Sequence, residues 1–129
     1  MGVKALHDPT EGGLAAGLHE MAHAAGVRIL IERQAVLWFE PGVAVCQALG
    51  ADPWSTLVSG TLLAVFAPKA ARTALAAFAQ QGHRAAVIGT TEPGAGVIDT
   101  AGHPIPWLER DEVARLLSAT GSASTVSQA

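Results

Sequence analysis

The stretch His7-Asp8-Pro9-Thr10-Glu11-Gly12-Gly13-Leu14 decides the fold, because it joins a strand-like segment to a helix through a glycine loop. Pro9 lacks a backbone N–H and restricts Asp8 to an extended conformation. Gly12 and Gly13 carry no Cβ atom, so a ligand can approach their backbone closely. A strand, a glycine loop and a helix start in this order favour an anion-binding site at the helix N-terminus.

The helix that follows also carries a short zinc-protease pattern, His19-Glu20-Met21-Ala22-His23. Histidines at positions i and i+4 can ligate one zinc ion, with Glu20 as general base. The longer form of this motif would place its next ligand at Ile29, which cannot bind zinc. Helical spacing predicts a buried stripe on the opposite side of the helix, formed by Leu14, Leu18, Met21 and Ala25. We therefore expect His19 and His23 to face solvent or another domain, and a zinc metalloprotease remains the weaker alternative.

Composition limits the classes of function. The 129 residues suit one domain, and 50% of them are hydrophobic. A net charge of -3 without a Lys/Arg cluster argues against nucleic-acid binding. The longest apolar runs, such as residues 61–67, are too short to span a membrane. The single cysteine, Cys46, and the absence of a signal-peptide pattern favour the reducing cytoplasm.

Periodicity and turn residues predict alternating strands and helices. Strands are expected at residues 3–6, 27–31, 61–67, 85–90 and 97–100, and helices at 12–25, 41–49, 69–81 and 111–117. Residues 97–100 are expected to form a hairpin with the preceding strand, and a short strand is expected near 105–107. Asp52 and Asp111 are expected to cap helical turns. The pattern predicts one α+β domain over residues 1–117, a mixed sheet with packed helices, and a disordered tail over residues 118–129.

Four segments occur in an order that points to a known family. They are the stretch from His7 to Ala22, Leu49-Gly50-Ala51-Asp52-Pro53, Ser59-Gly60-Thr61-Leu62-Leu63 and Ala86-Val87-Ile88-Gly89. Together they resemble the C-terminal domain of the aminoimidazole ribonucleotide synthetase-related superfamily, from residue 3 to about residue 110. The first segment is similar to the hydrogenase expression/formation branch, whose members dehydrate a thiocarboxamide with ATP.

The resemblance implies half of a binding site. In this superfamily the N-terminal domain supplies most of the ATP and magnesium site, and the C-terminal domain contributes the glycine loop. Asp8, Thr10, Gly12 and Gly13 would therefore bind phosphate or substrate. An N-terminal ATP-binding domain, in the same or a separate chain, is the expected partner. Without this domain we expect no ATP turnover. The resemblance assigns no catalytic residues to this chain, and a homodimer is possible.

Two positions depart from the family pattern. Glu11 stands where the hydrogenase-maturation branch commonly has arginine, and Ser59 stands where the family usually has glutamate. Both changes indicate a related but distinct subgroup, and a non-catalytic ligand-binding or assembly module of the same fold is the main alternative. For the loop itself, the plainer interpretation is that Thr10 only caps the helix and the glycines allow a tight turn.

Overall fold

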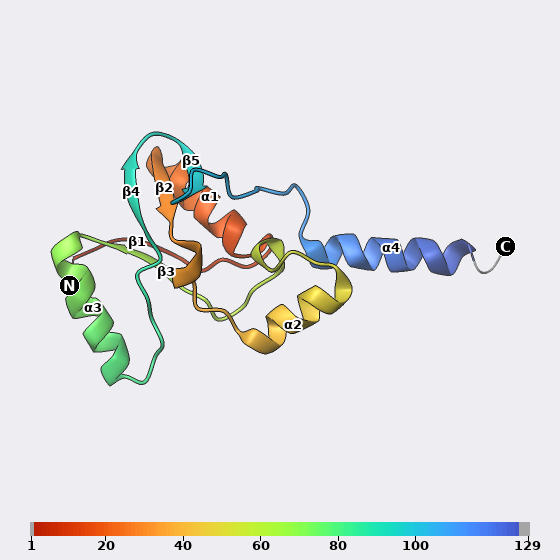
Figure 1. Cartoon of the computed structure of the whole chain (residues 1–129), viewed down its shortest axis with the longest axis horizontal. Helices are drawn as coiled ribbons and strands as arrows, with labels where there is room; N and C mark the ends of the chain where they lie inside the picture. The colour runs from red at the N-terminus through yellow and green to blue at the C-terminus, as the bar shows by residue number, and fades with distance from the viewer. Residues whose placement is uncertain (1, 127–129) are drawn as a thin grey trace.

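The structure, a computed structural model, describes residues 2–126 and has an α+β fold (Figure 1). The elements in chain order are β1 (Val3–His7), α1 (Gly13–Ala25), β2 (Val27–Ile31), η1 (Arg33–Ala35), α2 (Glu40–Leu49), η2 (Pro53–Ser55), β3 (Leu63–Phe66), α3 (Pro68–Gln80), β4 (Gly89–Pro93), β5 (Gly96–Asp99) and α4 (Glu112–Val126). The short helical turn predicted after Asp52 is present as η2, and the Asp52 side chain accepts the Trp54 N–H as predicted.

The strands form two small sheets. β1 and β3 pair antiparallel, and β2 lies at the centre of a mixed sheet between β4, which is antiparallel to it, and β5, which is parallel. The predicted hairpin between residues 97–100 and the preceding strand is therefore wrong. β2 is the only strand of the mixed sheet with two neighbours in the described chain, so each edge of its backbone finds hydrogen-bond partners.

The core lies between α1 and the mixed sheet. It joins the apolar face of α1 to side chains of β2, β3 and β5, namely Leu14, Ala15, Leu18, Ala22, Ile29, Ile31, Leu63, Val97 and Ile105. Ile31 and Ile105 are each only 1% exposed. The predicted strand near residues 105–107 is absent, and its place is taken by an isolated bridge between Ile98 and Pro104. Ile105 still enters the core, and its N–H donates to the Val97 carbonyl.

The largest differences from the predicted boundaries are at β4 and α4. β4 begins at Gly89, whereas residues 85–88 lie outside the sheet. The last helix was expected to end near residue 117, with a disordered tail from 118, but α4 continues to Val126 and extends away from the rest of the molecule (Figure 1). Residues 127–129 of the predicted tail lie outside the described residues. Asp111 caps α4 as predicted, because its Oδ1 accepts the Val113 N–H at 2.8 Å.

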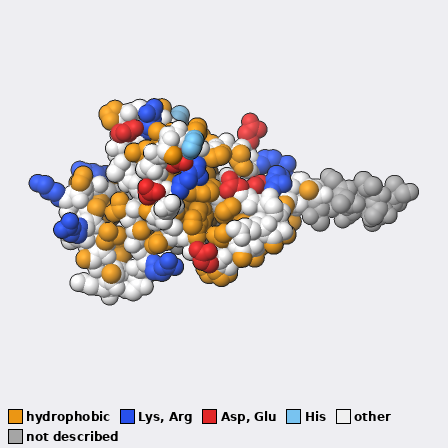
Figure 2. All heavy atoms as spheres, in the orientation of Figure 1, with side chains coloured by type: hydrophobic (Ala, Val, Ile, Leu, Met, Phe, Trp, Pro, Cys, Tyr) orange, Lys and Arg blue, Asp and Glu red, His pale blue; other side chains and the backbone are white. Residues whose placement is uncertain are grey.

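The surface is rich in apolar side chains. Large hydrophobic side chains that are at least 55% exposed occur on several elements and loops: Leu6, Phe39, Val45, Leu49, Leu62, Val87 and Leu117. Figure 2 shows hydrophobic side chains spread over much of the visible face, with acidic and basic side chains between them. Within residues 2–126, no helix has both the length and the hydropathy that crossing a membrane requires.

Candidate functional site

The glycine loop has the left-handed backbone that its sequence suggests. Gly12 has a φ of 81° and Gly13 a φ of 70°, a region that other residues rarely adopt. Gly12 is the N-cap of α1, and among the described residues no side chain makes a cap hydrogen bond to this helix. The interpretation of Thr10 as the helix cap is therefore wrong. Thr10 instead contributes its carbonyl, which accepts the N–H groups of Gly13 at 3.2 Å and Val58 at 3.1 Å.

Gly13 is required because the chain packs against itself at this point. A Cβ atom at Gly13 would lie 2.5 Å from the Thr56 carbonyl oxygen and 2.6 Å from that of Trp54. The backbone of η2 and the residue after it therefore lies directly against the helix start. The space that a ligand was predicted to use at Gly13 is filled by this backbone, and Gly13 is buried.

Gly12 meets a carboxylate from the far end of the chain. Its N–H donates to Oδ2 of Asp111 at 2.6 Å, a contact that spans 99 positions in the sequence. A negative charge is favoured there, because a helix N-terminus carries a partial positive charge. The loop therefore holds an anionic group, and that group belongs to the protein itself. Sequence analysis predicted only a capping role for Asp111, since no local pattern indicates a contact over this distance.

The first turn of α4 is held at a second point by Glu112. This buried carboxylate accepts the Asp52 N–H at 2.9 Å and pairs with Arg115. Arg115 in turn donates to the Gly50 carbonyl at 2.9 Å. The hydrogen bond from Arg115 and that from the Asp52 N–H lower the pKa of Glu112 below its ordinary value. The start of α4 thus joins two segments that carry the family resemblance, the glycine loop and residues 49–53.

The outer side of the loop is open to solvent. Asp8, Thr10 and Glu11 are exposed, and so is Ser59. The backbone hydrogen bond between Val58 and Thr10 brings the segment of Ser59 beside the loop. The two positions that depart from the family pattern, Glu11 and Ser59, therefore lie in neighbouring segments at the surface.

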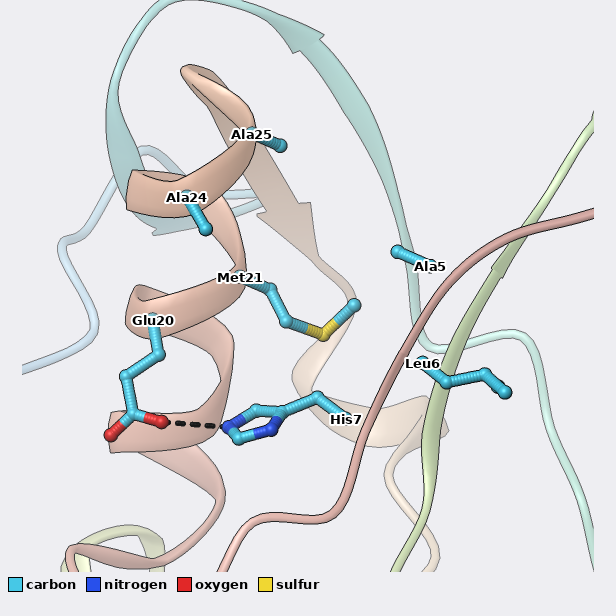
Figure 3. A pocket seen from close by; sticks show the side chains of 7 residues that line it. All are labelled: Ala5, Leu6, His7, Glu20, Met21, Ala24 and Ala25. Atoms are coloured by element: carbon cyan, nitrogen blue, oxygen red, sulfur yellow. Dashed lines mark hydrogen bonds and ion pairs between the residues drawn. The ribbon is translucent and has the colours of Figure 1, made fainter.

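A hollow of about 410 Å³ lies between β1 and α1 (Figure 3). Its walls are mostly apolar, and at one side the His7 ring points from β1 toward Glu20 on α1. Nε2 of His7 and Oε2 of Glu20 are 2.7 Å apart. Glu20, the proposed general base of the zinc alternative, is therefore already paired with a residue outside that motif.

The zinc alternative has no support in the geometry. Nε2 of His19 donates to the Ile105 carbonyl at 2.7 Å, and the ring stacks on Trp107 with a centroid distance of 4.9 Å. A nitrogen that carries this hydrogen cannot ligate zinc. His19 is half-buried against Ile105 and Trp107 of its own domain, so the expectation that it faces solvent or another domain is wrong, whereas His23 is exposed as expected. Residues 2–126 contain no group of three or more His, Cys, Asp or Glu side chains arranged to hold a metal.

Comparison with known families identifies the class of domain. The model of the family described as AIR synthase related protein, C-terminal domain, matches residues 1–100, and the chain belongs to this family. The match ends before Asp111 and Glu112, so the contacts made by the start of α4 lie outside the matched segment.

Among individual proteins, the chain is similar to HypE. The carbamoyl dehydratase HypE of Bradyrhizobium diazoefficiens is 42% identical over 77 residues, which are 59% of this chain and 22% of that protein. The crystal structure of Escherichia coli HypE, a hydrogenase maturation protein, has a TM-score of 0.77 at 32% identity and covers 89% of this chain and 38% of that one. A crystal structure of HypE in complex with ATP has a TM-score of 0.73 at 27% identity and covers 84% of this chain and 37% of that one. The chain therefore spans between 22% and 38% of the length of these relatives. The resemblance to the hydrogenase-maturation branch and the α+β fold are confirmed.

Proposed function

We propose that this chain acts as the C-terminal domain of a HypE-like, ATP-dependent dehydratase of hydrogenase maturation. In this role it contributes the glycine loop to a site that an N-terminal ATP-binding domain completes. The observation that carries the proposal is the loop itself: Gly12 and Gly13 have left-handed backbones at the N-terminus of α1, in a chain that matches HypE structures along most of its length.

The loop has the chemistry to hold a phosphate. The Gly12 N–H donates to a carboxylate oxygen of Asp111, and this supports an anion-binding role for the position. Thr10 is exposed beside it and offers a hydroxyl, and Asp8 is exposed on the same loop. Gly13 contributes through the backbone shape that it allows. These residues would bind the phosphate of ATP or of the substrate, while ATP supplies the phosphoryl group when bound.

Most of the ligands that bind magnesium would come from the N-terminal ATP-binding domain. Mg²⁺ prefers carboxylate and water oxygens, and this loop offers the exposed carboxylates of Asp8 and Glu11. Asp8 would orient a metal-bound group. Glu11 repels an anion at short range, so the phosphate affinity of this half of the site alone is low.

The apolar surface is consistent with a partner domain. Exposed hydrophobic patches on soluble proteins mark interaction sites, and Leu6 on β1 and Phe39 before α2 are 60% and 75% exposed. We assign part of this surface to the N-terminal ATP-binding domain, in the same or a separate chain. The proposal also includes a homodimer, in which a second copy of the chain covers part of this surface, and a cytoplasmic location.

A non-catalytic ligand-binding or assembly module of the same fold is the second candidate. It is favoured by the two departures beside the loop, Glu11 in place of arginine and Ser59 in place of glutamate. If these positions face the substrate in the family, their replacement removes a positive and a negative group from the site. The module would bind its ligand and leave the reaction to other proteins.

A chimera separates the two functions. The 129-residue chain is fused to the N-terminal part of Bradyrhizobium HypE in place of that protein's own C-terminal domain, and ATP binding and hydrolysis are measured. The dehydratase proposal predicts hydrolysis, and Thr10→Val, which keeps the side-chain shape, should raise KM for ATP. A matched Thr73→Val variant on α3 should not. Binding without hydrolysis would identify the module, and a well-folded chimera that binds no ATP would contradict the dehydratase proposal.

A further inference from the structure

One carboxylate joins the N-termini of two helices. Oδ1 of Asp111 accepts the Val113 N–H in the first turn of α4, and Oδ2 accepts the Gly12 N–H at the start of α1. Capping α4 needs only the first of these oxygens. The second reaches a loop that is 99 positions away, and its bond of 2.6 Å is short for a backbone N–H donor.

The position that Asp111 occupies is the one that a phosphate oxygen would need. A single N–H group cannot donate fully to two anions. Two negative groups that both lie within hydrogen-bond distance of it also repel each other. A phosphate that uses the Gly12 N–H must therefore displace the Asp111 carboxylate. The Asp111 carboxylate and a phosphate therefore compete for the Gly12 N–H and cannot both bind there.

The Asp111 side chain lies at the surface end of a segment that leads into α4, so it can leave the Gly12 N–H while the core stays closed. Residues 106–110, which lead into α4, are all exposed. α4 itself extends away from the body of the molecule beyond its first turn (Figure 1). The match to the family model ends at residue 100, before this segment. Glu112 and Arg115 anchor the same turn to residues 50–52, which returns Asp111 to the loop once the anion has left.

We propose that the first turn of α4 is an autoinhibitory latch, in which the Asp111 carboxylate occupies the anion position at Gly12 and must be displaced before a phosphate binds. The inference rests on the proposed function of the glycine loop. It adds that the free domain is held in a low-affinity state by its own side chain.

The test measures inorganic phosphate binding to the full 129-residue chain by NMR. The amide signals of Gly12 and Gly13 are followed during titration at constant ionic strength. Asp111→Ser keeps one oxygen to cap α4 and loses the oxygen that reaches Gly12. Asp111→Asn removes the charge and keeps the size, which provides a second variant if the serine variant loosens α4. Glu109→Gln is the matched control, because it removes an exposed charge from the same segment.

The latch predicts that Asp111→Ser lowers the Kd for phosphate at the loop by about tenfold or more, the effect of losing one charge-assisted competitor. Asp111→Asn should lower it by a smaller factor, and Glu109→Gln should leave it at the wild-type value. Equal loop affinity in the wild type and both Asp111 variants would overturn the latch and leave the anion-binding role of the loop intact. If phosphate shifts the loop amides in none of the proteins, both the latch and the anion-binding role are overturned.

Discussion

The close packing of the η2 region on the glycine loop predicts a large effect for Gly13→Ala. A Cβ atom there would lie 2.5 Å and 2.6 Å from two carbonyl oxygens, and side-chain carbons essentially never approach other atoms within 3.0 Å. The backbone must therefore move by about half an ångström, and such overpacking costs about 1–3 kcal/mol. The left-handed backbone, with φ at 70°, adds about 1–2 kcal/mol for any residue with a Cβ atom. We expect Gly13→Ala to lower the free energy of unfolding by about 2–5 kcal/mol.

Gly26→Ala is the matched control for this prediction. Gly26 has a similar φ of 64°, but a Cβ atom there would have nothing within 4 Å. Both variants share the cost of the left-handed backbone and the same change in the unfolded chain. Urea unfolding followed by circular dichroism should therefore show Gly13→Ala to be less stable than Gly26→Ala by about 1–3 kcal/mol. Equal losses of stability would refute the close contact between the loop and the η2 region.

Three further predictions concern the core, the turn after β5 and the thiol. Ile31→Ala should lower the free energy of unfolding by about 2–5 kcal/mol in urea, because this side chain is 1% exposed; a loss below about 1 kcal/mol would contradict its place in the core. The hydrogen bond from Arg33, and then that from the His103 N–H, lower the pKa of Asp99 from 3.8. Asp99 therefore stabilises the fold above that pH, and this contribution is lost as the pH falls through the lower folded-state pKa. Urea midpoints measured between about pH 2 and pH 6 should show a smaller loss at acid pH in Asp99→Asn than in the wild type; equal profiles would refute the assignment. Cys46 is 8% exposed, so it should react slowly with a thiol reagent in the folded protein and rapidly in urea; equal rates would contradict its burial.

Helix ends were predictable because single residues mark them. Gly26 and Gly50 end α1 and α2 with φ values of 64° and 68°, as expected for glycine after the last helical residue. Pro68 begins α3, where the missing N–H of proline has no cost. These signals act within one turn of the chain, so they can be interpreted without knowledge of the tertiary structure.

Strand positions in the last third of the chain were less predictable, because pairing decides them. Residues 85–88 are apolar and indicate a strand, yet β4 is the more polar segment that follows, whose register places Gly89 opposite Ile31. β5 pairs with β2 and not with β4, although a glycine turn lies between β4 and β5. Both outcomes depend on the edges of β2, about 60 residues earlier in the sequence.

Only the local part of the candidate site could be predicted, because its other contacts join residues far apart in the sequence. The backbone shape of Gly12 and Gly13 follows from their residue type. The contact between Gly12 and Asp111 does not, because it spans 99 positions and depends on where α4 begins. The hydrogen bond from His19 to the Ile105 carbonyl was not predictable either, because it spans 86 positions. The spacing of His19 and His23 had suggested a metal site instead. Spacing describes which side chains share a helix face, but it contains no information about the backbone that packs on that face.

The central place of β2 has a consequence for how the chain is made. β2 ends at Ile31, but its two neighbours end at Pro93 and Asp99, so a ribosome must add more than sixty further residues before both edges of β2 are covered. During that interval an apolar strand, Val27 to Ile31, has backbone groups that any other strand can pair with. Distant strand pairs also form slowly, because a long loop must close first. Newly made chains therefore pass through a period of exposure to aggregation that ends only when β5 has joined the sheet.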